Sequence, residues 1–201
     1  MRTINVFLVA IAVSACGTPA SPASADNDAT GAVNDAPADA PADAPVDTAA
    51  EVSATAEFVA TLADFDCIKN GTKVGHFYVD NRLGQKDAAV AVAKANAKGA
   101  QYPLGTIIRL FPLEAMVKRG GKDFASTGGW EMFNLKIDGK AMAIVKRGGA
   151  EVSNASGSCA GCHTPAKDYD FVCGQDHGCA PIPSTPDLID ALQDMDPTCA
   201  K

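Results

Sequence analysis

The chain has 201 residues, with 24 acidic and 17 basic side chains and a formal net charge of −7 at neutral pH. Seven acids and no bases lie within residues 17–51, so the rest of the chain, apart from Arg2, holds 17 acids and 16 bases. A nearly neutral remainder without a basic groove, or a stripe of alternating aromatic and basic residues, argues against a nucleic-acid-binding protein.

The first residues are typical of an export signal. Arg2 precedes the apolar run 4–13, which is too short to stay in a bilayer as a spanning helix. The sequence Val-Ser-Ala-Cys that ends at Cys16 resembles the lipobox of bacterial lipoproteins, whose Cys becomes the lipidated first residue of the mature protein. We therefore predict a lipoprotein signal peptide at residues 1–15 and membrane attachment only through a lipid on Cys16. An ordinary signal peptide cleaved near Ala15 or Ala20 is the alternative.

Residues 16–53 are predicted to be a disordered tether. They consist mainly of Ala, Pro, Asp, Ser and Thr, with an Asp-Ala-Pro repeat that starts at Asp35, Asp39 and Asp43. So few large apolar side chains cannot offset the entropy lost on ordering, and the acidic charges keep such a linker extended. In lipoprotein families an Asp after the lipidated Cys favours the inner membrane. Gly17 stands there, so we expect the outer membrane, facing the periplasm or the cell surface.

Residues 54–201 are long enough for one domain with its own core, and its first half predicts strands and a helix. Residues 74–80 are rich in β-branched and aromatic side chains and predict a strand. An Ala-rich helix follows over 88–98, with Asp87 as its N-cap and Gly99 at its end. A turn at 102–105 then leads into a strand over 106–112.

The second half predicts a hairpin and a short helix. Residues 130–137 and 141–146 are predicted strands around the turn Asp138-Gly139. Thr185 can cap a helix that starts at Pro186. The predicted apolar face of this helix consists of Leu188, Ile189, Leu192 and Met195. Together these elements indicate an α+β fold, an antiparallel β-rich domain with a few short helices.

Cys159 to His163 read C-x-x-C-H, which is the attachment site of a c-type haem. Two thiols bond to the haem vinyl groups and the adjacent imidazole ligates the iron. A structural zinc site is one alternative, because Cys173, His177 and Cys179 imitate a second ligand pair. A redox dithiol is another, although no βαβ pattern surrounds the motif.

Four further cysteines remain for disulfides in an oxidising compartment: Cys67, Cys173, Cys179 and Cys199. Four cysteines allow three connectivities. We favour Cys173 with Cys179, which closes a local loop, and Cys67 with Cys199, which ties the two ends of the domain.

The motifs Y-V-D, Y-P-L-G-T, G-G-W-E-M-F, C-A-G-C-H and D-Y-D-F-V follow one another between residues 74 and 172. This order resembles the cytochrome P-460 and cytochrome c′-beta family. The resemblance implies an antiparallel β-rich fold, usually dimeric, with one covalent haem c. It also implies thioether links at Cys159 and Cys162, His163 as the proximal iron ligand, and an open or gas-binding distal face.

The chain departs from the cytochrome P-460 pattern at two positions. The Lys that bonds the haem edge in hydroxylamine-oxidising relatives falls on Leu110, and residues 106–114 contain no Lys. The family's distal Arg falls on Gly75. The absence of this Lys and this Arg argues against hydroxylamine oxidation. Another lysine, such as Lys118, could still reach the haem edge. Whether the protein is an enzyme is left open. Phe77 and Leu110 are candidates for an apolar distal wall, although an ordinary core role is the alternative for Phe77.

Two functional hypotheses follow. In the first, the iron binds or redox-transforms a small diatomic or nitrogen-oxide ligand. In the second, a tethered electron carrier serves a redox partner protein and its haem has six ligands. Candidates for the sixth ligand are His76, His177, Met116, Met132 and Met142. A lipoprotein with zinc at the C-x-x-C pair is a third possibility.

Overall fold

The computed structural model of the chain describes residues 58–139, 141–174, 176–182 and 184–199. The predicted signal peptide, the lipidation site Cys16 and the predicted tether lie outside the described residues. Within these ranges no helix is long and apolar enough to span a membrane.

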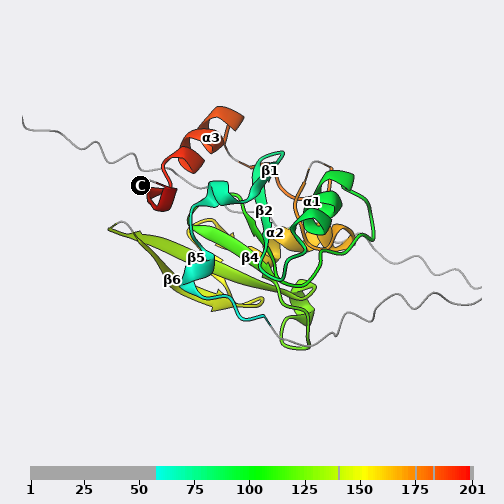
Figure 1. Cartoon of the computed structure of the whole chain (residues 1–201). Coiled ribbons are helices and arrows are strands. Elements are labelled where there is room, and N and C mark those ends of the chain that lie inside the picture. Colours follow the sequence, from blue (N-terminus) through cyan, green and yellow to red (C-terminus); the bar gives the residue numbers. More distant parts are fainter. Residues whose placement is uncertain (1–57, 140, 175, 183, 200–201) are drawn as a thin grey trace, which may run out of the picture. The chain divides into compact units, whose positions relative to one another are not determined.

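The domain is built on a six-stranded antiparallel sheet, and neighbouring strands in the sheet are also consecutive along the chain (Figure 1). The strands are β1 Thr72–Val74, β2 Phe77–Asn81, β3 Thr106–Arg109, β4 Glu114–Lys118, β5 Trp130–Asp138 and β6 Ala141–Gly148. A separate two-stranded hairpin, β7 Ser153–Asn154 and β8 Gly157–Ser158, follows β6. The fold class predicted from the sequence, antiparallel α+β with a few short helices, is confirmed.

Two of the predicted strands differ in the structure. The expected single strand over 74–80 is two strands, β1 and β2, with Val74 opposite Phe77. Gly75 makes the tight reversal between them possible because its φ of +57° is in the left-handed region. The strand expected over 106–112 ends at Arg109, so Leu110 lies in the bend before β4. The predicted hairpin around Asp138-Gly139 is confirmed as β5 and β6.

Short helices surround the sheet. They are the α-helices α1 Lys86–Ala95, α2 Cys159–His163 and α3 Pro186–Asp194, and the 3-10 helices η1 Leu62–Asp64, η2 Ile68–Asn70, η3 Ala125–Thr127, η4 Thr164–Tyr169 and η5 Pro197–Cys199. Helix α1 follows Gln85 rather than the expected cap Asp87, and it ends before Asn96, which is left-handed with a φ of 48°. The start of α3 is as predicted, because the Thr185 side chain accepts a hydrogen bond from Leu188 N.

Each face of the sheet has its own hydrophobic core. The first, which we call the motif-side core, also includes residues of α1 and is packed against Cys159. Its buried members are Val79, Ala89, Val90, Ala93, Tyr102, Ile108, Met116, Trp130, Met132, Val152 and Val172. The second, called the opposite core, consists of Ala60, Phe65, Ile107, Ala115, Val117, Phe133, Leu135 and Met142. The two sets separate by strand alternation, because successive side chains point to opposite faces.

Helix α3 contacts the domain through a different face from the predicted one. Ile189 is 2% exposed and Gln193 is 1% exposed, whereas Leu188, Leu192 and Met195 are 46%, 37% and 72% exposed. The buried amide of Gln193 donates to the carbonyls of His76 and Leu110, at 2.7 and 2.8 Å. Two backbone acceptors, one at the β1–β2 turn and one in the bend between β3 and β4, therefore favour a polar residue for this contact, and the sequence pattern does not show them.

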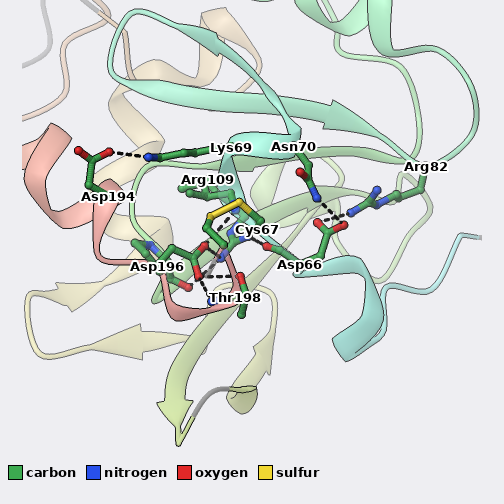
Figure 2. The surroundings of a disulfide bond; sticks show 12 residues. Asp66, Cys67, Lys69, Asn70, Arg82, Arg109, Asp194, Asp196 and Thr198 are labelled. Atoms are coloured by element: carbon green, nitrogen blue, oxygen red, sulfur yellow. Dashed lines mark hydrogen bonds and ion pairs between the residues drawn. A yellow bond between two sulfur atoms is a disulfide. The ribbon is translucent and has the colours of Figure 1, made fainter. Parts of the chain in front are cut away.

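A disulfide between Cys67 and Cys199 holds the C-terminal segment on the domain (Figure 2). Next to it the carboxylate of Asp196 accepts from Ile68 N at 3.0 Å and from Thr198 N at 3.0 Å. The second disulfide joins Cys173 to Cys179. Both bonds have the pairing favoured above.

The two disulfides should stabilise the domain unequally. Cys67 and Cys199 are 132 residues apart and Cys173 and Cys179 are six apart. By loop-closure entropy the long loop is worth about 5 kcal/mol and the short loop about 2 kcal/mol. We expect Cys67→Ser/Cys199→Ser to lower the urea midpoint clearly more than Cys173→Ser/Cys179→Ser, and equal losses would contradict this assignment.

Candidate haem-attachment site

The small β7–β8 hairpin brings the C-x-x-C-H segment onto the face of the sheet that carries the motif-side core. Asn154 in β7 donates to Glu114 Oε1 in β4 at 2.7 Å, and Asn134 in β5 donates to Ser153 O at 3.1 Å. Cys159 N then donates to Val152 O at 3.1 Å. These bonds tie the hairpin to the start of β4 and the middle of β5, so α2 begins over the motif-side core.

The two motif cysteines lie in α2, one turn apart. Ser158 caps this helix, because its hydroxyl accepts from Gly161 N at 3.1 Å. A Cβ at Gly161 would lie 3.3 Å from Ser158 Cβ, so the spacer between the cysteines has little room for a side chain. Neither Cys159 nor Cys162 belongs to a disulfide, and both are half-buried.

The imidazole of His163 is oriented by the backbone that follows the motif. Its Nδ1 is 2.7 Å from the carbonyl oxygen of Phe171, an acceptor only, so Nδ1 carries the proton and donates it. Nε2 then keeps its lone pair. Burial lowers the pKa of His163 below its ordinary value, and the Phe171 carbonyl partly offsets this effect. A neutral imidazole with a fixed tautomer is the form that ligates iron.

These residues fit a covalently attached haem. Two thiols outside any disulfide and an adjacent imidazole with an available Nε2 are the donor set that such a group requires. Burial, followed by the nearby charge of Glu114, raises the pKa of the Cys159 thiol and keeps it protonated.

The geometry does not favour the zinc and dithiol alternatives. Cys173 and Cys179 are bonded to each other and so cannot serve as thiolate ligands. Among the residues described by the structure, no three His, Cys, Asp or Glu side chains are grouped to hold a metal ion. The sheet is antiparallel throughout and contains no βαβ unit beside the C-x-x-C pair.

Comparison with protein families gives a match over residues 109–173 to the family cytochrome P460. This part of the chain is therefore similar to the cytochrome P460 family. The match covers β4 to β8, α2 and the Phe171 acceptor, about a third of the chain. The family implies a covalently bound c-type haem, so the match supports a haem c cytochrome. Neither the curated proteins nor the solved structures gave a match.

The structure brings the two candidates for the distal wall of this P460 site together. Phe77 is the first residue of β2 and is packed against the motif-side core. Leu110 follows Arg109, which pairs with Tyr78, so Leu110 lies beside Phe77. The Gln193 amide joins the backbone next to this pair, because it donates to the carbonyls of His76, which precedes Phe77, and of Leu110.

The predicted candidates for a sixth iron ligand are dispersed. Met142 lies in the opposite core, across the sheet from Cys159. His177 is 6% exposed, and its Nδ1 is 2.6 Å from the Val172 carbonyl, in the loop closed by Cys173 and Cys179. Met116 and Met132 lie opposite each other on β4 and β5 and are packed into the motif-side core. His76 is half-buried at the β1–β2 turn.

Lys118, the lysine considered above as a substitute for Leu110, is bonded within the domain. Its Nζ donates to the Gly128 carbonyl at 2.7 Å and to the Asp170 carboxylate. The ammonium also lies 5.1 Å from the centre of the Trp130 ring. With these acceptors in place, the amine has a structural role inside the domain.

Glu114 is a residue of the site that sequence reasoning missed. It lies at the start of β4 on the motif side, bonded to Asn154 and close enough to raise the pKa of Cys159. Burial raises the pKa of Glu114 itself. Its local sequence, a single Glu before Ala-Met-Val, gives no signal of this role, because Asn154 is 40 residues away.

The raised pKa of Glu114 predicts a pH-dependent stability. As pH rises from about 4, the unfolded chain loses this proton first and the folded protein keeps it longer. The stabilisation from Glu114 is therefore full at acid pH and is lost as pH rises through the folded pKa. Glu114→Gln keeps an acceptor for Asn154 and cannot ionise. We expect its urea midpoint to rise relative to that of the unmodified protein between about pH 4 and about pH 8.

The matched control is Asp123→Asn, which neutralises an exposed carboxylate. Its difference from the unmodified protein should stay nearly constant over the same pH range. If the urea midpoints of Glu114→Gln and the unmodified protein changed with pH in parallel, the burial of Glu114 would not make the stability depend on pH in this way.

Proposed function

We propose that this chain is an exported, lipid-anchored monohaem cytochrome in which His163 is the proximal iron ligand. On the opposite side of the haem it binds or redox-transforms a small nitrogen-oxide ligand such as nitric oxide. The sequence contains one C-x-x-C-H motif, which supports a single haem. When bound, the haem supplies an iron centre that accepts such ligands and exchanges single electrons.

The observation that carries the proposal is the hydrogen bond from His163 Nδ1 to the Phe171 carbonyl. It fixes the ring with Nε2 as the coordinating atom, and a strong Nδ1 donor bond increases the basicity of the imidazole. His177, the other histidine of this region, is bonded to the next carbonyl, that of Val172. Both rings therefore contact one backbone segment, residues 171–172.

The surroundings support ligand binding or one-electron chemistry over multi-electron oxidation. The expected distal wall is apolar, with Phe77 and Leu110 adjacent. The amine of Lys118 is bonded to Asp170 and Gly128. An apolar pocket with few donors favours neutral diatomic ligands, because it offers little stabilisation to a charged or strongly hydrogen-bonding species.

A spectrum of the haem-bearing protein tests the proposal. The full chain, matured in cells that attach c-type haem, should be red, high-spin and five-coordinate, and its spectrum should change on addition of nitric oxide. A low-spin spectrum indifferent to nitric oxide would favour the electron carrier. Met116→Leu and Met132→Leu would then show whether a core methionine is the sixth ligand, because the variant without that ligand becomes high-spin. A colourless protein that contains zinc would overturn the proposal.

The lipid anchor and the outer-membrane location have a separate test. Cys16→Ser removes the thiol that a lipoprotein signal requires. We expect the variant to appear as a soluble or unprocessed species, while the unmodified protein fractionates with outer membranes. Cys67→Ser/Cys199→Ser, which leaves Cys16 in place, is the control and should remain in the membrane fraction. Equal fractionation of the Cys16→Ser variant and the unmodified protein would contradict the anchor.

A further inference from the structure

The acceptor that orients His163 lies in an unusual backbone turn. Asp170 and Phe171 are consecutive non-glycine residues with φ values of 54° and 60°. The left-handed region is sterically unfavourable for residues other than glycine, and a bulky residue such as Phe is seldom found there. Such a conformation persists only where the surrounding contacts hold it firmly.

Asp170 is the residue through which those contacts act. It is 2% exposed, and its carboxylate accepts from Tyr102 N at 2.9 Å and from the ammonium of Lys118. Its backbone carbonyl accepts from the indole Nε1 of Trp130 at 2.7 Å. Three donors from the loop after α1, from β4 and from β5 thus converge on one residue.

Phe171 is held from the other side. Its N donates to the Ala166 carbonyl at 2.9 Å, within the segment that follows the haem motif. Its ring lies against Gly128, where a Cβ would come within 2.4 Å of Phe171 Cδ2. Lys118 also donates to the Gly128 carbonyl, so the same ammonium ties Asp170 and the glycine under the Phe171 ring.

We propose that Asp170, through its buried ion pair with Lys118, is a positioning residue for the iron ligand. By fixing the Asp170–Phe171 turn, it places the Phe171 carbonyl where His163 Nδ1 donates to it. This inference rests on the proposed role of His163 as the proximal ligand. Asp170 acts through the backbone and touches neither the motif cysteines nor the distal wall.

The expected effect has a definite sign. A well-placed carbonyl acceptor makes the imidazole a stronger donor to iron, which stabilises the ferric state. When the turn relaxes and the bond lengthens, the iron–histidine stretching frequency should fall and the reduction potential should rise. A purely structural role for Asp170 would lower stability and leave both quantities unchanged.

The test compares Asp170→Asn with Glu131→Gln in the haem-bearing full chain. Asn fits the left-handed region and keeps an acceptor for Tyr102 N, while the charge that pairs with Lys118 is lost. Glu131 is 3% exposed, and its carboxylate binds Arg119 and Arg147, so it is a matched buried carboxylate. Its neighbour Phe133 on the same face of β5 belongs to the opposite core. We expect both variants to lose stability and only Asp170→Asn to shift the stretching frequency and the potential.

The double variant Asp170→Asn/Lys118→Met separates positioning from destabilisation. It removes the unpaired buried ammonium, so stability should recover in part. The spectroscopic shift should persist, because the ion pair is still absent. A shift that vanishes as stability recovers, or an equal shift in Glu131→Gln, would overturn this inference alone. A wild-type protein without haem, or without histidine-ligated iron, would overturn the proposed function together with it.

Discussion

The two carbonyls of Asp170 and Phe171 join the sheet to α2, the helix that contains the C-x-x-C-H motif. The first accepts from Trp130 in β5 and the second from His163 at the end of α2. Because these carbonyls belong to neighbouring residues, a movement of β5 reaches the imidazole through a single peptide unit. The haem motif by itself supplies the thiols and the ring, while the sheet determines where the ring points.

The ion pair between Lys118 and Asp170 adds little net stability to the core. The two side chains are only 7% and 2% exposed, and the free energy of desolvating two charges can equal the free energy gained from their attraction. An apolar pair of similar volume could fill the space with comparable stability. Such a pair could not hold a left-handed turn through directed bonds, so the charges are better explained by the geometry they impose than by the stability they add.

Features that depend on neighbouring residues could be predicted from the sequence, and features that depend on distant partners could not. A few consecutive residues determine each of three features: the C-x-x-C-H motif, the hairpin at Asp138-Gly139 and the helix cap at Thr185. Strand β4 was not predicted because it begins and ends with a charged residue. Glu114 is bonded to Asn154, 40 residues later, and Lys118 is bonded to Asp170, 52 residues later. The face of α3 was misassigned for the same reason, since Gln193 is buried by carbonyls 117 and 83 residues earlier. The motif predicts His163 as the ligand, whereas the carbonyl that accepts from its Nδ1 is visible only in the fold.

The bond between Cys67 and Cys199 also constrains the order in which the protein can mature. Its two thiols are separated by 132 residues, and the haem-binding cysteines lie between them. During synthesis Cys67 therefore emerges first, and Cys159 and Cys162 follow before its own partner arrives. A premature bond from Cys67 would occupy a thiol of the C-x-x-C-H motif and would leave Cys199 without its partner.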